Sequence, residues 1–293
     1  MITQPASPTF HRVRTTTAAD GVPLTVHQWE PEEPRGAVFY VHGLQSHAGW
    51  LFESGPELAA RGCAVYAADR RGSGTSGGQR GHLPSAEAVL DDYAAHFDAV
   101  RDRCPQGVPV TAVGQSFGGS VLGALLSTGR IAPDAVVLCA PALGQQYRRH
   151  GRDGMDRIRE RTGLRRSPVT LKDEDYTADH GYLSFMANDH LMLRQTTDGF
   201  RAAMVELELL YRESGPWRWH GPQVPVYYAR PERDAIIDLD AVAEVLSRLC
   251  PQAVEVRFAA DHHYLEFSAV RDRFWDWLAG VAVPGAAGRE GCL

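Results

Sequence analysis

A serine lies at the centre of a Gly-x-Ser-x-Gly pattern, Gly-Gln-Ser-Phe-Gly, at residues 114–118. The apolar run at residues 110–113 predicts a strand, and residues 118–127 predict a helix. A sharp turn between a strand and a helix exposes the serine hydroxyl, and glycines let the two elements approach more closely than side chains would permit. Ser116 is therefore the candidate nucleophile of an acyl-transfer reaction.

A serine hydroxyl needs a base to activate it, and the base needs an acidic residue to orient it. For a nucleophile on a strand–turn–helix, the expected chain order is serine, then acid, then histidine. Asp234 follows the predicted strand at residues 224–229 and is the expected acid. Glu232 and Asp238 are competitors; Asp238 also suits the N-cap of the next helix.

Two adjacent histidines follow the last predicted strand, at residues 253–258. The sequence favours His262 as the base, because it comes just past the strand, where the loop turns over the site. His263 is the alternative, since predicted strand ends are uncertain by about two residues or more. Asp261 adjoins His262 in the chain and is poorly placed to accept its Nδ1 proton.

Two N–H groups are expected to stabilise the oxyanion that forms when the serine attacks a carbonyl. Phe117 supplies one, and Leu44 supplies the other from the turn after the predicted strand at residues 37–41. That turn contains His42 and Gly43, which we also expect at the edge of the substrate pocket. His42 is interpreted as a residue that shapes the turn rather than as the base.

Short apolar strands alternate with helical stretches along most of the chain, which predicts an α/β fold with a mostly parallel sheet covered by helices on both faces. Residues 13–17 and 24–29 predict an antiparallel opening hairpin. The further predicted strands are residues 37–41, 64–67, 110–113, 135–139, 224–229 and 253–258, and the predicted helices are 52–61, 84–103, 118–127, 239–250 and 269–280.

This alternation is interrupted between residues 143 and 222, where no strand is apparent. Long insertions of this kind often cover active sites. We therefore predict a hydrolase core in two parts, residues 1–142 and 223–283, a helical cap at 143–222 and a flexible tail at 284–293. Tyr182, Trp217 and Trp219 are candidates for the pocket wall, or alternatively part of the core of the cap.

Three segments together resemble a known family: the His42-Gly43 turn, residues 69–81 (Asp-Arg-Arg-Gly-Ser-Gly-Thr-Ser-Gly-Gly-Gln-Arg-Gly) and residues 114–119. They are similar to the monoacylglycerol lipase and lysophospholipase group of the serine aminopeptidase-like α/β hydrolases. The resemblance implies an α/β-hydrolase fold, a Ser116–His262–Asp234 triad, an acyl-enzyme intermediate and no cofactor. It also implies a small acyl ester or thioester as substrate.

Residues 147–166 depart from a membrane-docking lid, because they contain eight arginines and few large apolar side chains. We favour a solvated helix whose arginines pair with Asp153, Asp156 and Glu160. The alternative is a basic rim that attracts an anionic substrate, such as a phosphorylated carrier or a phospholipid headgroup.

The same triad would also serve a thioesterase, cyclase or acyltransferase acting on an acyl carrier protein. An aminopeptidase and a non-catalytic binding protein on the same scaffold are less favoured, the latter because all three triad residue types are present. The oligomeric state is not predicted by the sequence.

The bulk composition excludes several classes of protein. Acidic residues outnumber basic ones by 36 to 30, which argues against general affinity for nucleic acid. No run of about 18 apolar residues predicts a membrane span. The first ten residues lack a signal-peptide pattern, and the five scattered cysteines lack metal-ligand spacing. We therefore predict a cytoplasmic protein without a metal site.

Overall fold

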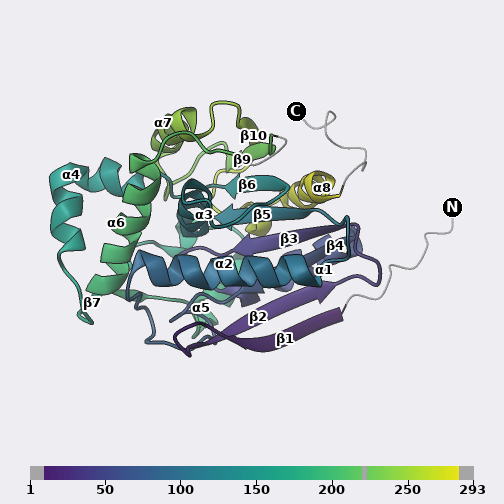
Figure 1. The fold of residues 1–293 in the computed structure, drawn as a ribbon, viewed down its shortest axis with the longest axis horizontal. Helices are drawn as coiled ribbons and strands as arrows, with labels where there is room; N and C mark the ends of the chain where they lie inside the picture. Colours follow the sequence, from purple (N-terminus) through teal and green to yellow (C-terminus); the bar gives the residue numbers. More distant parts are fainter. Residues whose placement is uncertain (1–9, 220–222, 284–293) are drawn as a thin grey trace.

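The main sheet draws its strands from almost the whole chain. The computed structural model describes residues 10–219 and 223–283, and within them eight strands form one sheet in the order β1-β2-β4-β3-β5-β6-β9-β10 (Figure 1). These strands are β1 (Phe10–Thr17), β2 (Pro23–Glu30), β3 (Gly36–Val41), β4 (Cys63–Ala68), β5 (Val110–Gln115), β6 (Ala135–Cys139), β9 (Val226–Pro231) and β10 (Val254–Phe258). The β1–β2 and β2–β4 pairs are antiparallel and the remaining pairs are parallel. The predicted fold class is confirmed.

Helices cover both faces of this sheet, which explains why its central strands β4, β3, β5 and β6 are buried along their whole length and mostly apolar. The helices are α1 (Ser54–Ala60), α2 (Ala86–Arg103), α3 (Phe117–Ser127), α7 (Leu239–Leu249) and α8 (Arg271–Ala282). Phe39 and Val41 of β3 pack in one apolar cluster with α2 and α3. Val38 and Tyr40, on the opposite face, pack with α1 and α8. Among the described helices, none is both long and apolar enough to cross a bilayer.

The chain between β6 and β9, residues 140–225, is here called the β6–β9 segment. It contains α4 (Gln145–Arg159), β7 (Arg166–Pro168), a 3₁₀ turn η2 (Asp173–Asp175), α5 (His180–Asn188), β8 (Gln195–Thr197) and α6 (Asp198–Glu213). The two short strands pair antiparallel with each other, so the prediction that this region has no strand is wrong. Three-residue strands contain too little alternation to be detected in a sequence. The division into core and cap remains a prediction, and the predicted tail at 284–293 lies outside the described residues.

Helix α4 is bent at Gly151, whose φ of 61° is readily adopted by glycine but strained for other residues. The bend turns the second half of α4 back towards α6, which packs on both α3 and α4. Figure 1 shows α4 and α6 together at one end of the molecule, beyond the sheet. These two helices are therefore parts of the β6–β9 segment that can shape a site at that end.

Candidate active site

Ser116 occupies the turn between β5 and α3. Its φ of 54° and ψ of −119° lie in a region that residues other than glycine rarely adopt. Its N–H donates to the carbonyl of Cys139 (3.0 Å), and its carbonyl accepts from the N–H groups of Gly119 and Ala142, both at 2.8 Å. These hydrogen bonds, with the end of β6 and the chain after it and with the first turn of α3, hold the strained conformation in place.

The glycines on either side of the serine are required by close backbone contacts. A Cβ on Gly118 would lie 2.0 Å from the carbonyl oxygen of Val41, and a Cβ on Gly114 would lie 2.8 Å from that of Gly118. The expected close approach of strand and helix is confirmed. Since Val41 ends β3, the same packing brings the turn after β3 beside the serine.

Asp234 and His263 form a buried pair. The Nδ1 atom of His263 lies 2.7 Å from Oδ2 of Asp234, and both side chains are 0% exposed. The second carboxylate oxygen accepts N–H groups from Ile236 and Ile237 at 2.8 and 3.0 Å. Burial raises the pKa of Asp234, but the attraction of His263 and these hydrogen bonds outweigh it, so the pKa lies below its ordinary value.

An ionised Asp234 accepts the Nδ1 proton of His263, which leaves Nε2 as the basic nitrogen. This Nε2 atom is buried and has no hydrogen-bond partner among the described residues. A buried polar atom without a partner is costly in a folded protein and often marks a functional position. The pair therefore has the tautomer and the open nitrogen that a general base requires.

This geometry favours the alternative base, His263, over the sequence-based choice of His262, because His263 is the partner of Asp234 and His262 is half-buried one residue away. The reason is tertiary. The N–H of His263 donates to the carbonyl of Asp175, which pairs the loop after β10 with the β6–β9 segment and turns residue 263 inward. Of the two rival acids, Glu232 is exposed and Asp238 caps α7. Asp261, next to His262 in the chain, is an exposed partner of Arg233 at 3.7 Å.

His42 makes two hydrogen bonds that assign its tautomer. Its Nε2 accepts the N–H of Arg70 at 2.9 Å, so its Nδ1 is the nitrogen that donates to the carbonyl of Gly43, also at 2.9 Å. Burial, followed by the nearby charge of Arg70, holds the pKa of His42 well below its ordinary value. His42 is thus a neutral residue that shapes the turn, as the sequence indicated.

Arg70 is a residue of the site whose role the sequence did not reveal. Its buried guanidinium donates to the carbonyls of Gly43 (3.0 Å) and Leu44 (2.9 Å), and lies 5.1 Å from the ring centre of Phe117. Burial lowers the pKa of Arg70 to about 10. Arg70 therefore fixes the loop that carries Leu44 relative to the first residue of α3.

Leu44 and Phe117 remain the predicted oxyanion donors. A Cβ on Gly43 would lie 3.5 Å from the Cβ of Ser116, so the loop of Leu44 adjoins the serine. Phe117 is the first residue of α3, where an N–H group has no acceptor within its own helix.

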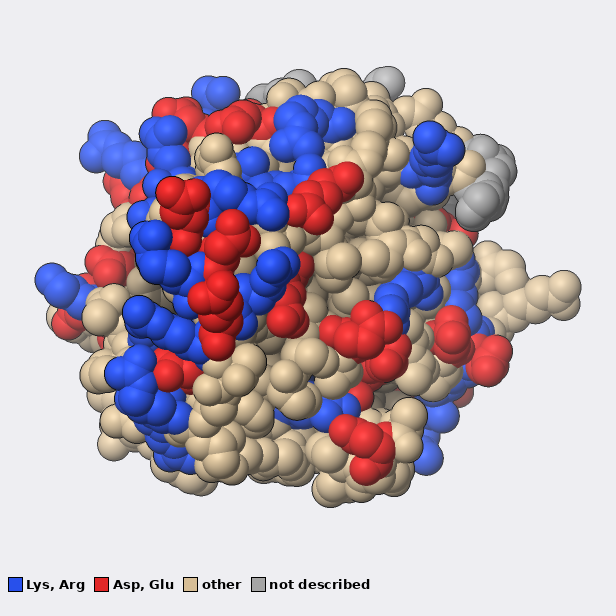
Figure 2. Space-filling model, turned by 60° about the vertical axis from the view of Figure 1, so that its left-hand side comes forward, with Lys and Arg blue, Asp and Glu red and all other residues tan. Residues whose placement is uncertain are grey.

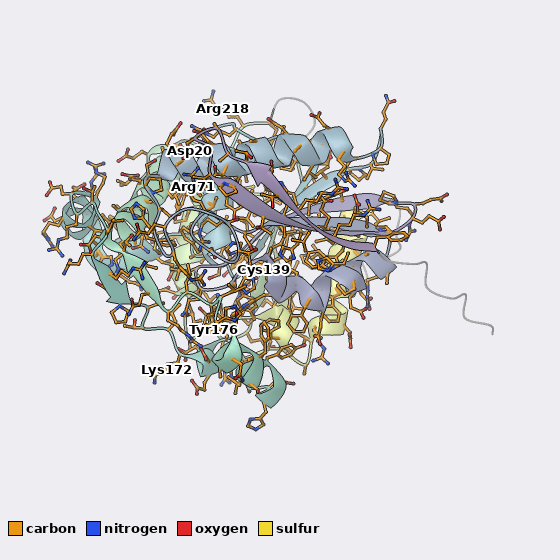
Figure 3. The ribbon with its side chains drawn as sticks, turned by 90° about the horizontal axis from the view of Figure 1, so that it is seen from below. Asp20, Arg71, Cys139, Lys172, Tyr176 and Arg218 are labelled. Carbon is orange, nitrogen blue, oxygen red and sulfur yellow. The ribbon has the colours of Figure 1, made fainter. Side chains whose placement is uncertain are left out.

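Tyr176 connects the loop that carries Leu44 with the loop after β10 that carries His263. Its hydroxyl donates to Oε1 of Gln45 at 2.8 Å, and its carbonyl accepts the N–H of Tyr264 at 3.1 Å. Its ring lies edge-on to the ring of His263, with centroids 5.7 Å apart. Figure 3 labels Tyr176 close to α5. The β6–β9 segment thereby contacts both sides of the candidate site.

The two tryptophans predicted for the pocket wall, Trp217 and Trp219, pack at the end of α3 that is far from Ser116. Trp217 is buried and its indole N–H donates to Ser127 (2.8 Å), the last residue of α3. That residue is about 16 Å from Ser116 along the helix axis. Trp219 packs edge-on against Trp217, 6.4 Å away. Both tryptophans therefore occupy the core position that the sequence left open, not the wall of a pocket at the serine.

Tyr182, the third aromatic residue predicted for the pocket wall, lies on α5. It stacks on Phe267 with ring centroids 4.3 Å apart, and its hydroxyl donates to Glu53. It lines a surface hollow of about 370 Å³ together with Phe52 and Phe185. Ser116 and His263 do not line this hollow, so its predicted role at the substrate remains only a prediction.

A mostly parallel sheet with a strained serine after β5, and an acid–histidine pair after β9 and β10, define an α/β hydrolase. The family profile described as serine aminopeptidase, S33 matches residues 32–260. Because this match covers most of the chain, the protein belongs to that family. The family resemblance predicted from the sequence is confirmed.

Individual relatives cover smaller parts of the chain. The monoacylglycerol lipase of Mycolicibacterium smegmatis is 33% identical over 124 residues, which are 42% of this chain and 44% of that protein. The human monoglyceride lipase is 32% identical over 104 residues, 35% of this chain and 34% of that protein. The matched part thus spans less than half the length of these curated relatives.

Among solved structures, a soluble variant of the Saccharomyces cerevisiae monoglyceride lipase with a substrate analogue superposes with a TM-score of 0.78. The alignment covers 94% of this chain and 96% of the yeast chain at 15% identity. At this identity the similarity establishes the fold.

Proposed function

We propose that the protein is a serine hydrolase that cleaves a carboxylic ester, with Ser116 as nucleophile, His263 as base and Asp234 as the residue that orients the base. The observation that carries this proposal is the buried Asp234–His263 hydrogen bond of 2.7 Å, together with the unpartnered Nε2 of His263. The strained turn at Ser116 supports it, because such strain is retained where it serves a function.

In the proposed reaction, His263 takes the hydroxyl proton as Ser116 Oγ bonds to the ester carbonyl carbon. The N–H groups of Leu44 and Phe117 stabilise the negative charge on the carbonyl oxygen. When the tetrahedral intermediate collapses, the alcohol leaves with the proton from His263. Water then adds to the acyl-enzyme with His263 again as base, and the carboxylic acid leaves as Ser116 recovers its proton.

The names of the relatives suggest the substrate class. Besides the monoacylglycerol lipases, they include a caffeoylshikimate esterase from Arabidopsis thaliana and the phospholipase YtpA of Bacillus subtilis. We infer that this chain hydrolyses a small acyl ester of the monoacylglycerol or lysophospholipid kind. Thioester cleavage and acyl transfer would use the same residues, so a comparison of matched octanoyl ester and thioester substrates separates these reactions.

A fluorophosphonate probe tests the proposed nucleophile directly. We expect the native protein to be labelled stoichiometrically, with mass spectrometry locating the adduct on Ser116, because an activated serine attacks the phosphorus as it would a carbonyl. Heat-denatured protein serves as the control and should remain unlabelled. An adduct on another residue, or no adduct on folded protein, would contradict the proposal.

Tyr176→Phe tests whether the link between the two loops matters for the reaction. Removing the hydroxyl leaves Oε1 of Gln45 without its donor next to Leu44, so we expect kcat to fall by about tenfold with little change in KM. Tyr66→Phe is the matched control, since it removes a hydroxyl bound to Glu30 at 2.9 Å on β4. Equal kcat losses in both variants would rule out a positioning role for Tyr176.

A further inference from the structure

A cavity of about 390 Å³ opens beside Leu44, on the side of the loop that faces α4 and α6. Its apolar part includes Leu44, Leu171 and Met204, and its outer part is lined by arginines. We call it the arginine cavity. Because Leu44 carries a proposed oxyanion N–H, the cavity begins next to the place where the substrate carbonyl would lie.

The bend in α4 produces this cavity. Arg149 precedes Gly151, and Arg161 follows the end of the helix, yet both line the same space. Arg201 lines it from the first turns of α6. Figure 2 shows blue side chains gathered at this end of the molecule, with red ones between them.

The lining carries an excess of positive charge. Four arginines line the cavity, with Asp198 as the only carboxylate among the described lining residues. Asp198 is paired with Arg165 at 2.8 Å. Arg149 and Arg201 donate to the carbonyls of Ile236 (3.0 Å) and Pro168 (3.2 Å), which carry no net charge.

The guanidinium of Arg161 makes no hydrogen bond or ion pair within the described part of the chain, whereas its backbone N–H donates to the carbonyl of Ile158 at 3.0 Å. Its electrostatic influence on Asp198 is nevertheless visible: the pKa of that carboxyl is lowered by the hydrogen bond from Arg165, with smaller contributions from Arg201 and Arg161. Arg149, Arg161 and Arg201 thus line the cavity without forming an ion pair with a carboxylate among the described residues, and Asp198 is engaged by Arg165.

This surplus is not a general feature of the protein. A cavity of about 440 Å³ between the β1–β2 hairpin and α2 is lined by four carboxylates and three arginines. There Arg71 is neutralised by Asp92 (2.5 Å) and Asp20 (2.7 Å), and Figure 3 shows Asp20 and Arg71 side by side. Elsewhere on α4, Arg148 and Arg152 are paired with Asp238 and Asp156. Of the three partners that the solvated-helix interpretation named, only Asp156 forms an ion pair among the described residues. The arginines that line the cavity fit the basic-rim interpretation.

We propose that the arginine cavity binds a phosphate group on the non-reacting end of the substrate, whose ester carbonyl lies at Ser116. This inference rests on the proposed hydrolase function. Arginine binds phosphate through paired N–H···O bonds, and a phosphate monoester close to −2 matches three arginines better than a singly charged group would.

The cavity is lined by Leu44, whose loop adjoins Ser116, and this neighbourhood suits a short spacer between carbonyl and phosphate. Ala142 is hydrogen-bonded to Ser116, and Arg149 lies only about 6 Å along α4 from its first residue, Gln145. A spacer of glycerol size spans about 10 Å or less from the carbonyl, whereas a pantetheine arm places its phosphate much farther away. We therefore take an acylglycerol phosphate, which has the shorter spacer, as the proposed substrate, and an acyl-coenzyme A thioester as the alternative that the test separates.

The test compares 1-octanoylglycerol, 1-octanoylglycerol 3-phosphate and octanoyl-coenzyme A as substrates. At about 20 mM salt, we expect kcat/KM for the phosphorylated ester to exceed that for the neutral ester by about tenfold, and about 500 mM salt to reduce this ratio. In the Arg149→Gln/Arg161→Gln variant the ratio should fall close to one. A preference for the coenzyme A thioester would overturn the short spacer.

The matched control is Arg157→Gln/Arg159→Gln, which removes two exposed arginines of α4 outside the cavity. The preference for phosphate should persist in this variant, and an equal loss in both variants would overturn the cavity in favour of a general charge effect. Calorimetric titration with octyl phosphate provides a readout that needs no catalysis. If both octanoyl esters are inert but octyl phosphate binding depends on Arg149 and Arg161, the hydrolase proposal fails while the phosphate site stands. If the neutral ester is hydrolysed but the phosphorylated ester is not preferred, the phosphate site is overturned while the hydrolase proposal stands.

Discussion

Ser116→Ala is expected to abolish ester hydrolysis, with kcat reduced by about 10⁴-fold or more for p-nitrophenyl octanoate. The substitution removes the Oγ atom that bonds to the carbonyl carbon, and no other side chain in this turn carries a nucleophile. Backbone hydrogen bonds to Cys139, Gly119 and Ala142 hold the turn, so the fold should persist. Steady-state kinetics with the chromogenic ester measure the loss.

The same variant checks that the loss is chemical. Its melting temperature should remain within about 3 °C of that of the unchanged protein, which corresponds to roughly 1 kcal/mol for a domain of this size. It should also be refractory to the fluorophosphonate probe. Undiminished turnover in a well-folded Ser116→Ala protein would refute the proposed function as a whole.

His263→Ala is expected to reduce kcat by about 10⁴-fold, whereas His262→Ala should retain most of the activity. The contrast follows from the hydrogen bond of 2.7 Å between His263 and Asp234, for which half-buried His262 has no equivalent among the described residues. Side-by-side kinetics of the two single variants measure it. A dominant loss in His262→Ala would restore the residue that the sequence favoured.

Folding must be controlled in this comparison, because His263→Ala leaves the carboxylate of Asp234 buried without its partner at a cost of about 3–5 kcal/mol. His263→Gln supplies an amide donor in place of Nδ1 and removes the basic nitrogen, so it should fold better yet remain inactive. Added imidazole should restore part of the activity to a folded His263→Ala protein. Rescue by imidazole would distinguish loss of the base from loss of the fold.

The elements of the hydrolase fold were predictable because their signals are local. The buried strands read as continuous apolar runs, since helices cover both faces, and each lies within a few residues of its predicted range. The turn at Ser116 was equally predictable, because its glycines are needed by the backbone next to them. By contrast, β7 and β8 were missed, since each depends on pairing with the other across the β6–β9 segment.

The pocket could not be predicted in the same way. Trp217 and Trp219 are large aromatic residues near the end of an insertion, a pattern that fits both a pocket wall and a core. The hydrogen bond of Trp217 to the far end of α3 decides between them. Arg70 stood in a recognised motif, but only the structure shows its guanidinium on the carbonyls of Gly43 and Leu44.

The sequence by itself determined the fold class, the family resemblance, the candidate nucleophile and its acid, because strand patterns and the glycine turn depend on residues that are close together in the chain. Only the tertiary structure pairs His263, rather than His262, with Asp234, since the inward residue is selected by backbone bonding to Asp175, far away in the chain. The arginine cavity also depends on the tertiary structure. The bend at Gly151 brings Arg149 and Arg161, which are separated in the chain, to the same cavity, and neither forms an ion pair with a carboxylate among the described residues.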